Sequence, residues 1–324
     1  MKKENILLTH SSLPTLSIVV PCFNEEEMLS LFYTEMMKVM LLLSESVKDF
    51  NFEFIFVDDG SIDASLDVLR NFTEQDNSVH YVSFSRNFGK EAAILAGLQK
   101  SQGQYIVVLD ADLQNPPSMI VQMFKAVVFG GYDCAGTRRV TRKGEPYIRS
   151  FFARLFYKIM VKISDVQIVD GACDFRLMSR KYVDAVLLLS ERNRFSKGIF
   201  PWVGFKTKWF EYENIERVAG VTKWSFLKLF FYSLDGIIAF SSKPLALASI
   251  FGMILFLGTL LFMGIVVIRK IIYGDSVTGW ASIVCIILFC SSVQLFTTGI
   301  LGQYLAKTYT EVKRRPYYVI KEEK

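Results

Sequence analysis

Short apolar runs alternate with longer segments whose apolar residues recur at helical spacing through the first half of the chain. The apolar runs predict strands at residues 16–21, 52–57, 79–84 and 105–109. The segments between and after them predict helices at residues 26–44, 63–72, 90–100 and 118–129. Strands that alternate with helices in this way favour an α/β fold, with a mostly parallel sheet and helices on both of its faces.

Two long runs without a charged residue follow, at residues 244–268 and 276–306. Each is long enough to cross a hydrocarbon core of about 30 Å, which needs about 20 helical residues. We therefore expect a region of two transmembrane helices at residues 244–306. A pair of buried core helices is the alternative, although soluble helices seldom continue past about 20 residues without a charge.

Basic residues next to these runs predict how the chain crosses the membrane, because Lys and Arg are enriched in cytoplasmic loops. Those on the outer sides of the two runs are Lys223, Lys228, Lys243, Lys313, Arg314 and Arg315. Arg269 and Lys270 lie between the runs and oppose the assignment. The pattern favours a multi-pass protein of the cell membrane with two spans, whose α/β domain and both termini are cytoplasmic.

These patterns divide the chain into an N-terminal tail at 1–14, a cytoplasmic α/β domain at 15–222, a juxtamembrane amphipathic helix at 223–243, the two-helix region at 244–306 and a basic cytoplasmic tail at 307–324. Residues 141–164 interleave basic and apolar side chains, which predicts another amphipathic helix at the membrane interface. An ordinary surface helix is the alternative there. The charged N-terminus continues into polar residues, so we expect no signal peptide.

Cysteine and histidine usage limits the chemistry that this chain can perform. The five cysteines form no C-x-x-C pair, which is typical of free thiols in a reducing compartment. With only His10 and His80 present, a histidine metal site and a Ser-His-Asp triad are both poorly supported. The net charge of +5 is modest, and we expect no nucleic-acid partner.

Pairs of acidic residues follow two of the predicted strands. Asp110 and Asp112 come directly after the run at 105–109, while Asp58 and Asp59 follow the run at 52–57. In open α/β sheets, ligands bind outside the carboxyl ends of the strands. Carboxylates there need a counter-charge, which a hard divalent cation carrying a diphosphate supplies. Together with the two apolar runs, this predicts an enzyme that joins a soluble nucleotide donor to something held in a membrane.

A metal ion has to carry the phosphates, because the chain lacks the glycine-rich loops that otherwise do so. The segment at 21–25, after the first strand, contains no glycine, and a Walker A motif is absent. Asp110, Asp112 and Gln114 alternate along the chain, so on an extended segment they would point the same way while Leu113 packs inward. Oxygen ligands of this kind suit Mg²⁺ or Mn²⁺.

Four motifs occur in order: VVPCFNE at 19–25, VDDGSID at 57–63, FSRNFGKE at 84–91 and DADLQNPP at 110–117. With these motifs the chain resembles inverting nucleotide-sugar glycosyltransferases of the GT-A fold. It is most similar to the polyprenyl-phosphate branch, which includes dolichyl-phosphate mannose synthases and bactoprenol glucosyltransferases. The resemblance covers almost the whole chain, and the two C-terminal runs match the bactoprenol type. It implies that residues 15–222 are a GT-A catalytic domain.

The same resemblance implies which residues bind the nucleotide: Pro21, Phe23, Glu25, Val57, Asp59, Asp110, Ala111, Arg192 and Arg194. Asp59 would accept hydrogen bonds from the base, and the two arginines would lie on a loop that closes over the donor. Asp110, Asp112 and Gln114 would hold the metal. For Asp58 and Asp59 the alternative is a turn before a helix, and Asp63 is expected to cap that helix.

A sugar site and an acceptor site follow from the resemblance too. Asp170, Asp174 and Arg176 would lie beside the sugar, where either aspartate would act as a base or anchor a hydroxyl group; an internal Asp–Arg ion pair is the alternative. Candidates for the lipid phosphate are Arg138, Arg149 and Lys223. A guanidinium group suits this role because its fork matches phosphate bidentately.

The implied reaction is metal-dependent transfer of a hexosyl group to undecaprenyl phosphate on the cytoplasmic membrane face, with inversion. Glucose from UDP-glucose is the favoured donor group, and the product would be a polyprenyl monophosphate-linked sugar for cell-envelope glycan modification. Another lipid or glycan acceptor, or an inactive scaffold that partners a flippase, are the alternatives. The expected partners are the nucleotide sugar, the polyprenyl phosphate and the bilayer, with a homo-oligomer and a downstream flippase as further candidates.

Overall fold

A computed structural model describes residues 15–139, 169, 171–212, 238, 241–273 and 279–324. Contacts within the chain divide it into two compact units. Unit 1 comprises Met1–Ser233 together with Arg315–Lys324, and unit 2 comprises Leu234–Arg314. The predicted interface helix at 141–164 and most of the juxtamembrane helix at 223–243 lie outside the described residues, as does the tail at 1–14.

Unit 1 is built on an eight-stranded sheet with the strand order β7-β5-β6-β4-β1-β2-β3-β8. Its strands are β1 Leu16–Cys22, β2 Phe52–Asp58, β3 Val79–Phe84, β4 Tyr105–Val108, β5 Cys134–Arg139, β6 Ala172–Ser179, β7 Thr207–Tyr212 and β8 Ile320–Glu323. The four neighbours β4, β1, β2 and β3 are parallel. Strand β6 runs antiparallel to β4 and β5, and β8 runs antiparallel to β3. The predicted mostly parallel sheet is confirmed.

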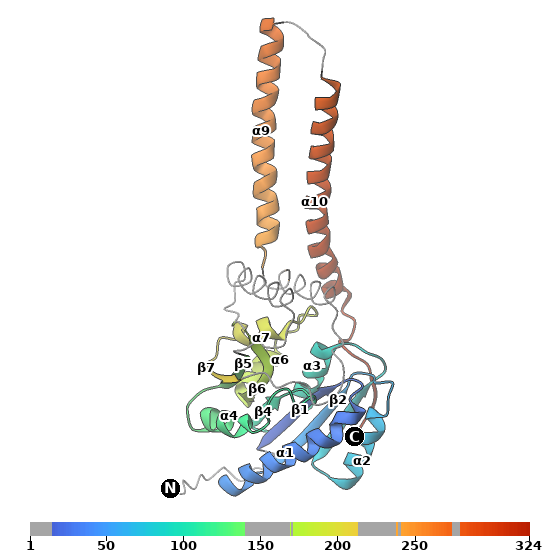
Figure 1. The fold of residues 1–324 in the computed structure, drawn as a ribbon, viewed down its shortest axis with the longest axis vertical. Helices are drawn as coiled ribbons and strands as arrows, with labels where there is room; N and C mark the ends of the chain where they lie inside the picture. Colours follow the sequence, from blue (N-terminus) through green and yellow to red (C-terminus); the bar gives the residue numbers. More distant parts are fainter. Residues whose placement is uncertain (1–14, 140–168, 170, 213–237, 239–240, 274–278) are drawn as a thin grey trace. The chain divides into compact units, whose positions relative to one another are not determined.

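Helices cover both faces of this sheet, as predicted (Figure 1). Those of unit 1 are α1 Glu26–Ser46, α2 Ser65–Gln75, α3 Lys90–Lys100, α4 Met119–Val128, α6 Arg180–Leu187 and α7 Ser196–Trp202. Helix α1 packs with α2 and α4 on one face, and α3 packs with α6 on the other. Every residue of β1 is buried, because a central parallel strand covered on both sides exposes neither of its faces.

Helix α3 packs closely on β1, and this packing positions the start of the helix relative to the sheet. A Cβ atom added to Gly97 of α3 would lie 2.2 Å from Cγ1 of Val19, which is closer than real Cβ atoms approach a neighbour. A glycine at this position therefore lets the helix axis lie directly against the strand. Since α3 starts at Lys90, its seating on the sheet places the Lys90 side chain at the carboxyl end of the parallel strands.

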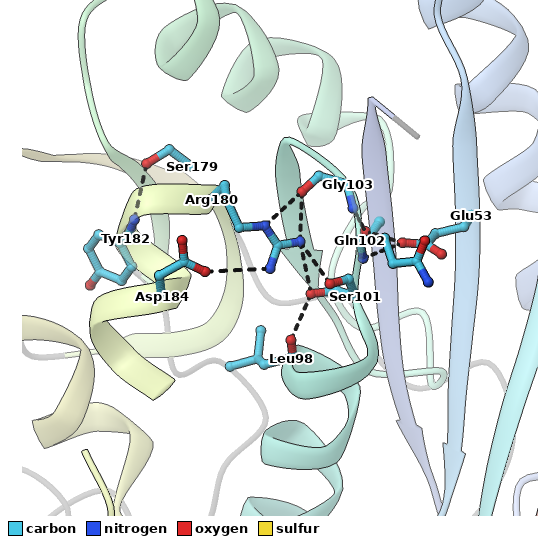
Figure 2. Close-up of polar contacts among 10 residues, drawn as sticks. Glu53, Leu98, Ser101, Gln102, Gly103, Ser179, Arg180, Tyr182 and Asp184 are labelled. Atoms are coloured by element: carbon cyan, nitrogen blue, oxygen red, sulfur yellow. Dashed lines mark hydrogen bonds and ion pairs between the residues drawn. The ribbon is translucent and has the colours of Figure 1, made fainter. Parts of the chain in front are cut away.

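At the opposite, amino-terminal end of the parallel strands, polar contacts hold the turn that leads from α3 into β4 (Figure 2). Arg180 donates to the carbonyl oxygens of Gly103 at 2.7 Å and Ser101 at 2.9 Å. The Glu53 carboxylate accepts from the backbone N–H of Gln102 at 2.7 Å on the other side of the same turn. Charge-assisted hydrogen bonds of this kind are about twice as strong as neutral ones. They fix β4 between β1 and β6.

Unit 2 contains two long helices, α9 Lys243–Tyr273 and α10 Trp280–Lys313, which contact each other. The stretch Ile286–Lys313 of α10 is long and apolar enough to cross a membrane. In α9 the described residues provide a shorter apolar stretch, Lys243–Thr259. Both predicted helices are therefore present, and α10 continues beyond residue 306, where the predicted membrane region ends. Among the described residues one candidate span is found, so the second span stays a prediction.

Candidate active site

Two loops at the carboxyl ends of β1 and β2 are joined by hydrogen bonds. The backbone N–H of Asn24 donates to Oγ of Ser61 at 2.8 Å, and the Asn24 side chain accepts from the N–H of Ile62 at 2.9 Å. The N–H of Glu25 donates to Oγ of Ser65 at 2.8 Å. Asn24 adopts a left-handed conformation with φ of 53°, which asparagine tolerates better than most residues. The two loops therefore form one continuous wall.

The predicted nucleoside-binding residues lie along this wall. Pro21 and Val57 are register partners on β1 and β2, and both are buried. Phe23 and Glu25 follow on the β1–α1 loop and are half-buried. The structure thus brings four of the predicted residues to one edge of the sheet. Their contact with a nucleoside stays a prediction.

The Asp59 carboxylate binds the backbone of the β3–α3 loop. It accepts from the backbone N–H groups of Phe88 at 2.7 Å and Gly89 at 2.9 Å. Burial raises the pKa of Asp59, and these backbone hydrogen bonds oppose the increase. Next to it, Gly60 has a φ of 69°, and an added Cβ would lie 2.4 Å from the carbonyl carbon of Arg86. The loop before α3 is therefore held tightly against the end of β2.

Asp58 and Asp63 have structural partners. Asp58 is buried and accepts from Oγ of Ser83 at 2.7 Å and from the N–H of Ser61 at 3.0 Å. This agrees with the turn that was the alternative reading for Asp58. Asp63 accepts from the N–H of Ser65, at the start of α2, at 3.0 Å. The N-cap position of α2 is Ala64, which has no side-chain cap, so Asp63 lies one residue before the cap position that we predicted for it.

Lys90 joins a carboxylate in the loop after β4 to a carboxylate on β6. Its Nζ lies 2.7 Å from Oδ1 of Asp110 and 2.8 Å from Oδ2 of Asp174. Val108 of β4 pairs with Arg176 of β6, so the antiparallel register places Asp110 and Asp174 at facing positions. The side chains of Lys90, Asp110 and Asp174 are 38%, 32% and 17% exposed. The cluster is thus partly open to solvent, as a site that binds a substrate must be.

The charges of this cluster determine its protonation. Burial would raise the pKa of Asp174, but Lys90 and Lys197 hold it at about 2. Burial raises the pKa of Asp110, with a smaller contribution from the neighbouring carboxylates, and Lys90 opposes the increase. For Lys90 the two carboxylates overcome the effect of burial and raise the pKa, so the ammonium stays charged. One ammonium shared by two carboxylates leaves a negative surplus, which a cation would offset.

Asp112 and Gln114 lie on a turn, and this differs from the extended segment that we expected. Leu113 has a φ of 54°, and the N–H of Gln114 donates to Oδ1 of Asp112 at 3.1 Å. The bend breaks the alternation on which the convergence of Asp110, Asp112 and Gln114 depended. Leu113 does pack against the core, as predicted. Metal binding by Asp110, Asp112 and Gln114 stays a prediction.

A hard cation nevertheless fits the oxygen atoms of this turn. Oδ1 of Asn115 is buried and has no hydrogen-bond donor among the described residues. The same segment of the chain carries Asp110 and Asp112, whose carboxylates are oxygen ligands of the type that Mg²⁺ and Mn²⁺ accept. Within the described residues, no group of three or more Asp, Glu, His or Cys side chains is arranged to hold a metal ion by itself. Such an ion would therefore take further ligands from water and from substrate phosphates, as Mg²⁺ commonly does.

Three residues of the cluster were missed by the sequence analysis. Lys90 is one of them, and Glu91 and Lys197 are the others. Glu91 accepts from the N–H of Ser196 at 2.9 Å and from its hydroxyl group, which ties the start of α7 to the start of α3. Lys197, the next residue of α7, lowers the pKa of Asp174. The motif FGKE at the carboxyl end of β3 was the available signal for Lys90 and Glu91.

Arg176 is placed differently from the other predicted catalytic residues. It is 2% exposed, its guanidinium group lies 3.8 Å from the ring centroid of Phe200, and it donates to the carbonyl oxygen of Cys173 at 2.9 Å. At this depth it acts on Asp174 through charge, since it helps to lower the pKa of that carboxylate. Direct contact of Arg176 with a sugar would need a rearrangement of β6. Asp170 lies outside the described residues.

The predicted phosphate-binding arginines have contacts within unit 1. Arg138, at the end of β5, donates to the carboxylate of Glu211 on β7, and both side chains are about half exposed. Arg194 donates to the carbonyl oxygen of Leu189 at 2.7 Å, and the guanidinium carbon of Arg192 lies 5.2 Å from the ring centroid of Tyr317. Arg149 and Lys223 lie outside the described residues.

Comparison with known proteins gives the family of the chain. Residues 17–187 match the family model described as glycosyl transferase family 2. A Bacillus subtilis protein, CsbB, which is named as a glycosyltransferase, is 40% identical over 95% of this chain and 91% of its own length. The prophage bactoprenol glucosyl transferase homolog of Escherichia coli and the bactoprenol glucosyl transferase of Shigella phage SfV are each 38% identical over 95% of this chain and 99% of their own lengths.

Solved structures resemble the chain more distantly. Glucosyl-3-phosphoglycerate synthase from Mycobacterium tuberculosis, in complex with Mn²⁺ and uridine-diphosphate-glucose, is 20% identical, with a TM-score of 0.42, over 69% of this chain and 77% of that chain. That similarity is too low to bear on the site. The family match and the sheet topology together confirm the predicted GT-A type of α/β fold. The chain belongs to glycosyl transferase family 2 and is a glycosyltransferase.

Proposed function

We propose that this enzyme transfers a glucosyl group from UDP-glucose to undecaprenyl phosphate, with inversion at the anomeric carbon. The observation that carries the proposal is the bridge from Lys90 to Asp110 and Asp174, which collects charged groups at the carboxyl ends of the strands. Relatives that align with nearly the whole chain are named bactoprenol glucosyl transferases, which supports both the sugar and the acceptor.

On the donor side, Asp110 and Asp112 would hold a divalent ion, Mg²⁺ or Mn²⁺, with Gln114 or Asn115 nearby as an amide ligand. When bound, the ion would offset the negative charge that develops on the departing nucleoside diphosphate. Lys90 presents an ammonium group at the same place and would therefore also stabilise the negative charge on the departing diphosphate. The wall formed by the β1–α1 and β2–α2 loops would bind the nucleoside.

On the acceptor side, a phosphate monoester is mostly dianionic at neutral pH, because its second pKa is about 6. It needs no strong base before it attacks. A carboxylate whose pKa is about 2, such as that of Asp174, is a weak base. We therefore assign Asp174 to holding Lys90 and a sugar hydroxyl group. One phosphate oxygen forms a bond to the anomeric carbon. The bond from that carbon to the diphosphate oxygen breaks, and its electron pair leaves with UDP.

Alignment of the two substrates would supply much of the rate enhancement, since holding reactants in the right orientation can lower the activation barrier by about 7–11 kcal/mol. Arg138 is the described candidate for the acceptor phosphate, and Arg149 and Lys223 complete the proposed set. The candidate span in α10 supports attachment to a membrane. The proposal includes a second span in α9, cytoplasmic termini and the interface helices. A homo-oligomer and a flippase that takes the product remain part of it as partners.

A direct assay tests this function. Purified full-length protein is incubated with undecaprenyl phosphate, Mn²⁺ and a panel of nucleotide sugars, and the lipid product is weighed by mass spectrometry. The proposal predicts a lipid heavier by one hexose residue with UDP-glucose, labile to mild acid as a phosphate-linked sugar is. A product formed only on diacylglycerol or on a glycan would support the alternative acceptors. Absence of any product with every donor would support the inactive scaffold.

A further inference from the structure

The C-terminal segment Arg315–Lys324 packs with unit 1, although it follows the last helix of unit 2. Its strand β8 pairs with β3 at the outer edge of the sheet. Lys324 and Tyr81 exchange backbone hydrogen bonds of 3.0 and 3.1 Å, and the N–H of Ser85 donates to the carbonyl oxygen of Val319 at 2.9 Å. The end of the chain therefore completes the sheet of the catalytic unit, and it covers an edge strand that would otherwise be open.

Side chains secure this strand. Glu322 accepts from Nε and Nη2 of Arg70 at 2.9 and 2.5 Å and from the hydroxyl group of Tyr81 at 2.6 Å. These hydrogen bonds lower the pKa of Glu322 to about 2, so the carboxylate is ionised at neutral pH. Glu323 pairs with Lys100 at 2.8 Å. Bidentate contacts of this type fix geometry as well as adding energy. The tail is thus a defined part of the fold.

Tyr318 supports the loop that precedes α3. Its ring stacks on Phe84 with centroids 4.7 Å apart, and its hydroxyl group donates to Oε1 of Gln99 at 2.6 Å. Phe84 in turn meets the ring of Phe88 edge-on at 5.8 Å. The N–H of Phe88 is one of the two donors to Asp59. A chain of ring contacts therefore connects the tail to the loop that ends at the Lys90 bridge.

Tyr317 supports the other loop of the donor site. Its hydroxyl group donates to the carbonyl oxygen of Ser190, and its ring lies beside the guanidinium group of Arg192. This loop connects α6 to α7, and its far end is held where Ser196 donates to Glu91. The tail therefore holds the start of this loop, at Ser190, while Glu91 holds its end, at Ser196. Both arginines that are assigned to the donor diphosphate lie between these two contacts.

We propose that Tyr317 and Tyr318 are positioning residues for the donor, through which the segment after α10 holds both loops beside the Lys90 bridge. This inference rests on the proposed function, because it assigns a purpose to the loop arginines in nucleotide-sugar binding. The two tyrosines act through Arg192 and the segment at 84–90 and need not touch the substrate. The C-terminal segment is accordingly part of the donor site.

Kinetics of the full-length enzyme test the role of Tyr317. Tyr317→Leu removes both the hydroxyl group and the ring, so we expect KM for UDP-glucose to rise roughly 5- to 30-fold, the size of one cation–π contact plus one hydrogen bond, while kcat changes less than about twofold. Tyr317→Phe keeps the ring and should give an intermediate KM. Tyr309→Leu is the matched control, because Tyr309 is 61% exposed on α10. Its KM should stay at the wild-type value.

Hydrogen exchange separates positioning from unfolding. The amides of Tyr81 and Ser85 donate to the tail, so their protection reports whether β8 remains paired. The proposal predicts that both amides stay protected in Tyr317→Leu while KM rises. An unchanged KM would overturn it, as would a rise in KM that appears only when these amides lose protection, since the pairing of β8 alone would then explain the effect.

A binding measurement keeps this inference separate from the proposed function. Calorimetry with UDP and Mn²⁺ needs no transfer reaction, and Tyr317→Leu should weaken UDP binding by the same factor as it raises KM. If wild-type protein binds UDP but forms no lipid product, the proposed acceptor is wrong while the role of the tail is still measured. Equal UDP affinity in wild type and Tyr317→Leu would refute the role of the tail.

Discussion

Asp110, two residues beyond the end of β4, and Asp174 of the antiparallel strand β6 share the ammonium group of Lys90. The strand register brings the carboxylates together, and the seating of α3 on β1 brings the ammonium to them. Two carboxylates this close would repel each other, so the lysine stabilises both in their charged forms. The cluster therefore keeps a fixed negative surplus at the place where we assign the metal and the leaving diphosphate.

Removal of the Lys90 charge should change metal binding and catalysis in opposite directions. In Lys90→Met the carboxylates lose a competing cation, so we expect Mn²⁺ to bind at least about tenfold more tightly in the absence of donor. A factor of ten corresponds to about 1.4 kcal/mol, and unit charges about 4 Å apart interact by about 1 kcal/mol in water and about 4 kcal/mol near a protein surface. Without the ammonium near the leaving group, kcat should fall about 100- to 1000-fold. Electron paramagnetic resonance of Mn²⁺ and initial rates measure the two effects.

Lys38→Met is the control for this experiment, because Lys38 forms a surface pair with Glu35 on α1 at 2.6 Å. That variant should leave both quantities unchanged. Weaker Mn²⁺ binding in Lys90→Met would contradict the account, since it would mean that the lysine assembles the metal site and does not compete with it.

Arg138 and Glu211 provide a pair of variants with different expected effects. If Arg138 binds the acceptor phosphate, Arg138→Ala should raise KM for undecaprenyl phosphate about 10- to 100-fold, the value of one charge-assisted hydrogen bond, and leave KM for the donor unchanged. Glu211→Gln removes the group that competes for the guanidinium, so KM for the acceptor should stay the same or fall. Steady-state kinetics with each substrate varied in turn measure both constants.

An equal rise in acceptor KM for Glu211→Gln and Arg138→Ala would oppose this assignment. Arg138 would then act through its ion pair with Glu211, which joins β5 to β7. An exposed pair of this kind contributes at most about 1 kcal/mol to stability, so both variants should fold.

The pH dependence of the reaction should follow the acceptor and not Asp174. Because the folded pKa of Asp174, about 2, lies below its ordinary value of 3.8, the stability that its charge contributes is complete above the ordinary value and is lost only as the pH falls toward 2. Between pH 5 and 8 the carboxylate stays ionised. We expect kcat/KM for undecaprenyl phosphate to fall below about pH 6, where the acceptor phosphate gains a proton.

Asp174→Asn should lower the rate at every pH, and kcat/KM should still fall below about pH 6 as in the wild type, which is the acidic limb of the pH profile. Asp184→Asn is the matched control, since Asp184 is exposed on α6, and it should have no effect. A limb that moves or disappears in Asp174→Asn would identify Asp174 as the titrating base and would refute its assignment as an anchor.

The sheet could be predicted from the sequence because its central strands are continuous apolar runs. The predicted strands at 16–21, 52–57, 79–84 and 105–109 agree with β1 to β4 to within a residue at either end. The acidic residues after β2 and β4 were correctly expected at the carboxyl edge of the sheet. A parallel α/β arrangement fixes that edge once the strands are known.

The remaining features depend on contacts between distant parts of the chain. Lys90 begins a helix, where a lysine is usually solvated, and its partner Asp174 lies on an antiparallel strand whose register no local pattern reveals. Strand β8 has a charged sequence, Ile320–Glu323, that reads as a polar tail; its place in the sheet is secured by Arg70 and Tyr81, which donate hydrogen bonds to Glu322. The turn at Leu113 has a left-handed conformation that leucine rarely adopts.

Metal dependence of lipid-phosphosugar formation tests the central claim most directly. Purified enzyme is assayed with UDP-glucose and undecaprenyl phosphate, then in EDTA, and then after Mn²⁺ is restored, with Asp112→Ala measured in parallel and its fold checked by circular dichroism. The account predicts that product formation stops in EDTA, returns with Mn²⁺ and is lost in the folded variant. A wild-type rate in EDTA, or in Asp112→Ala, would contradict it.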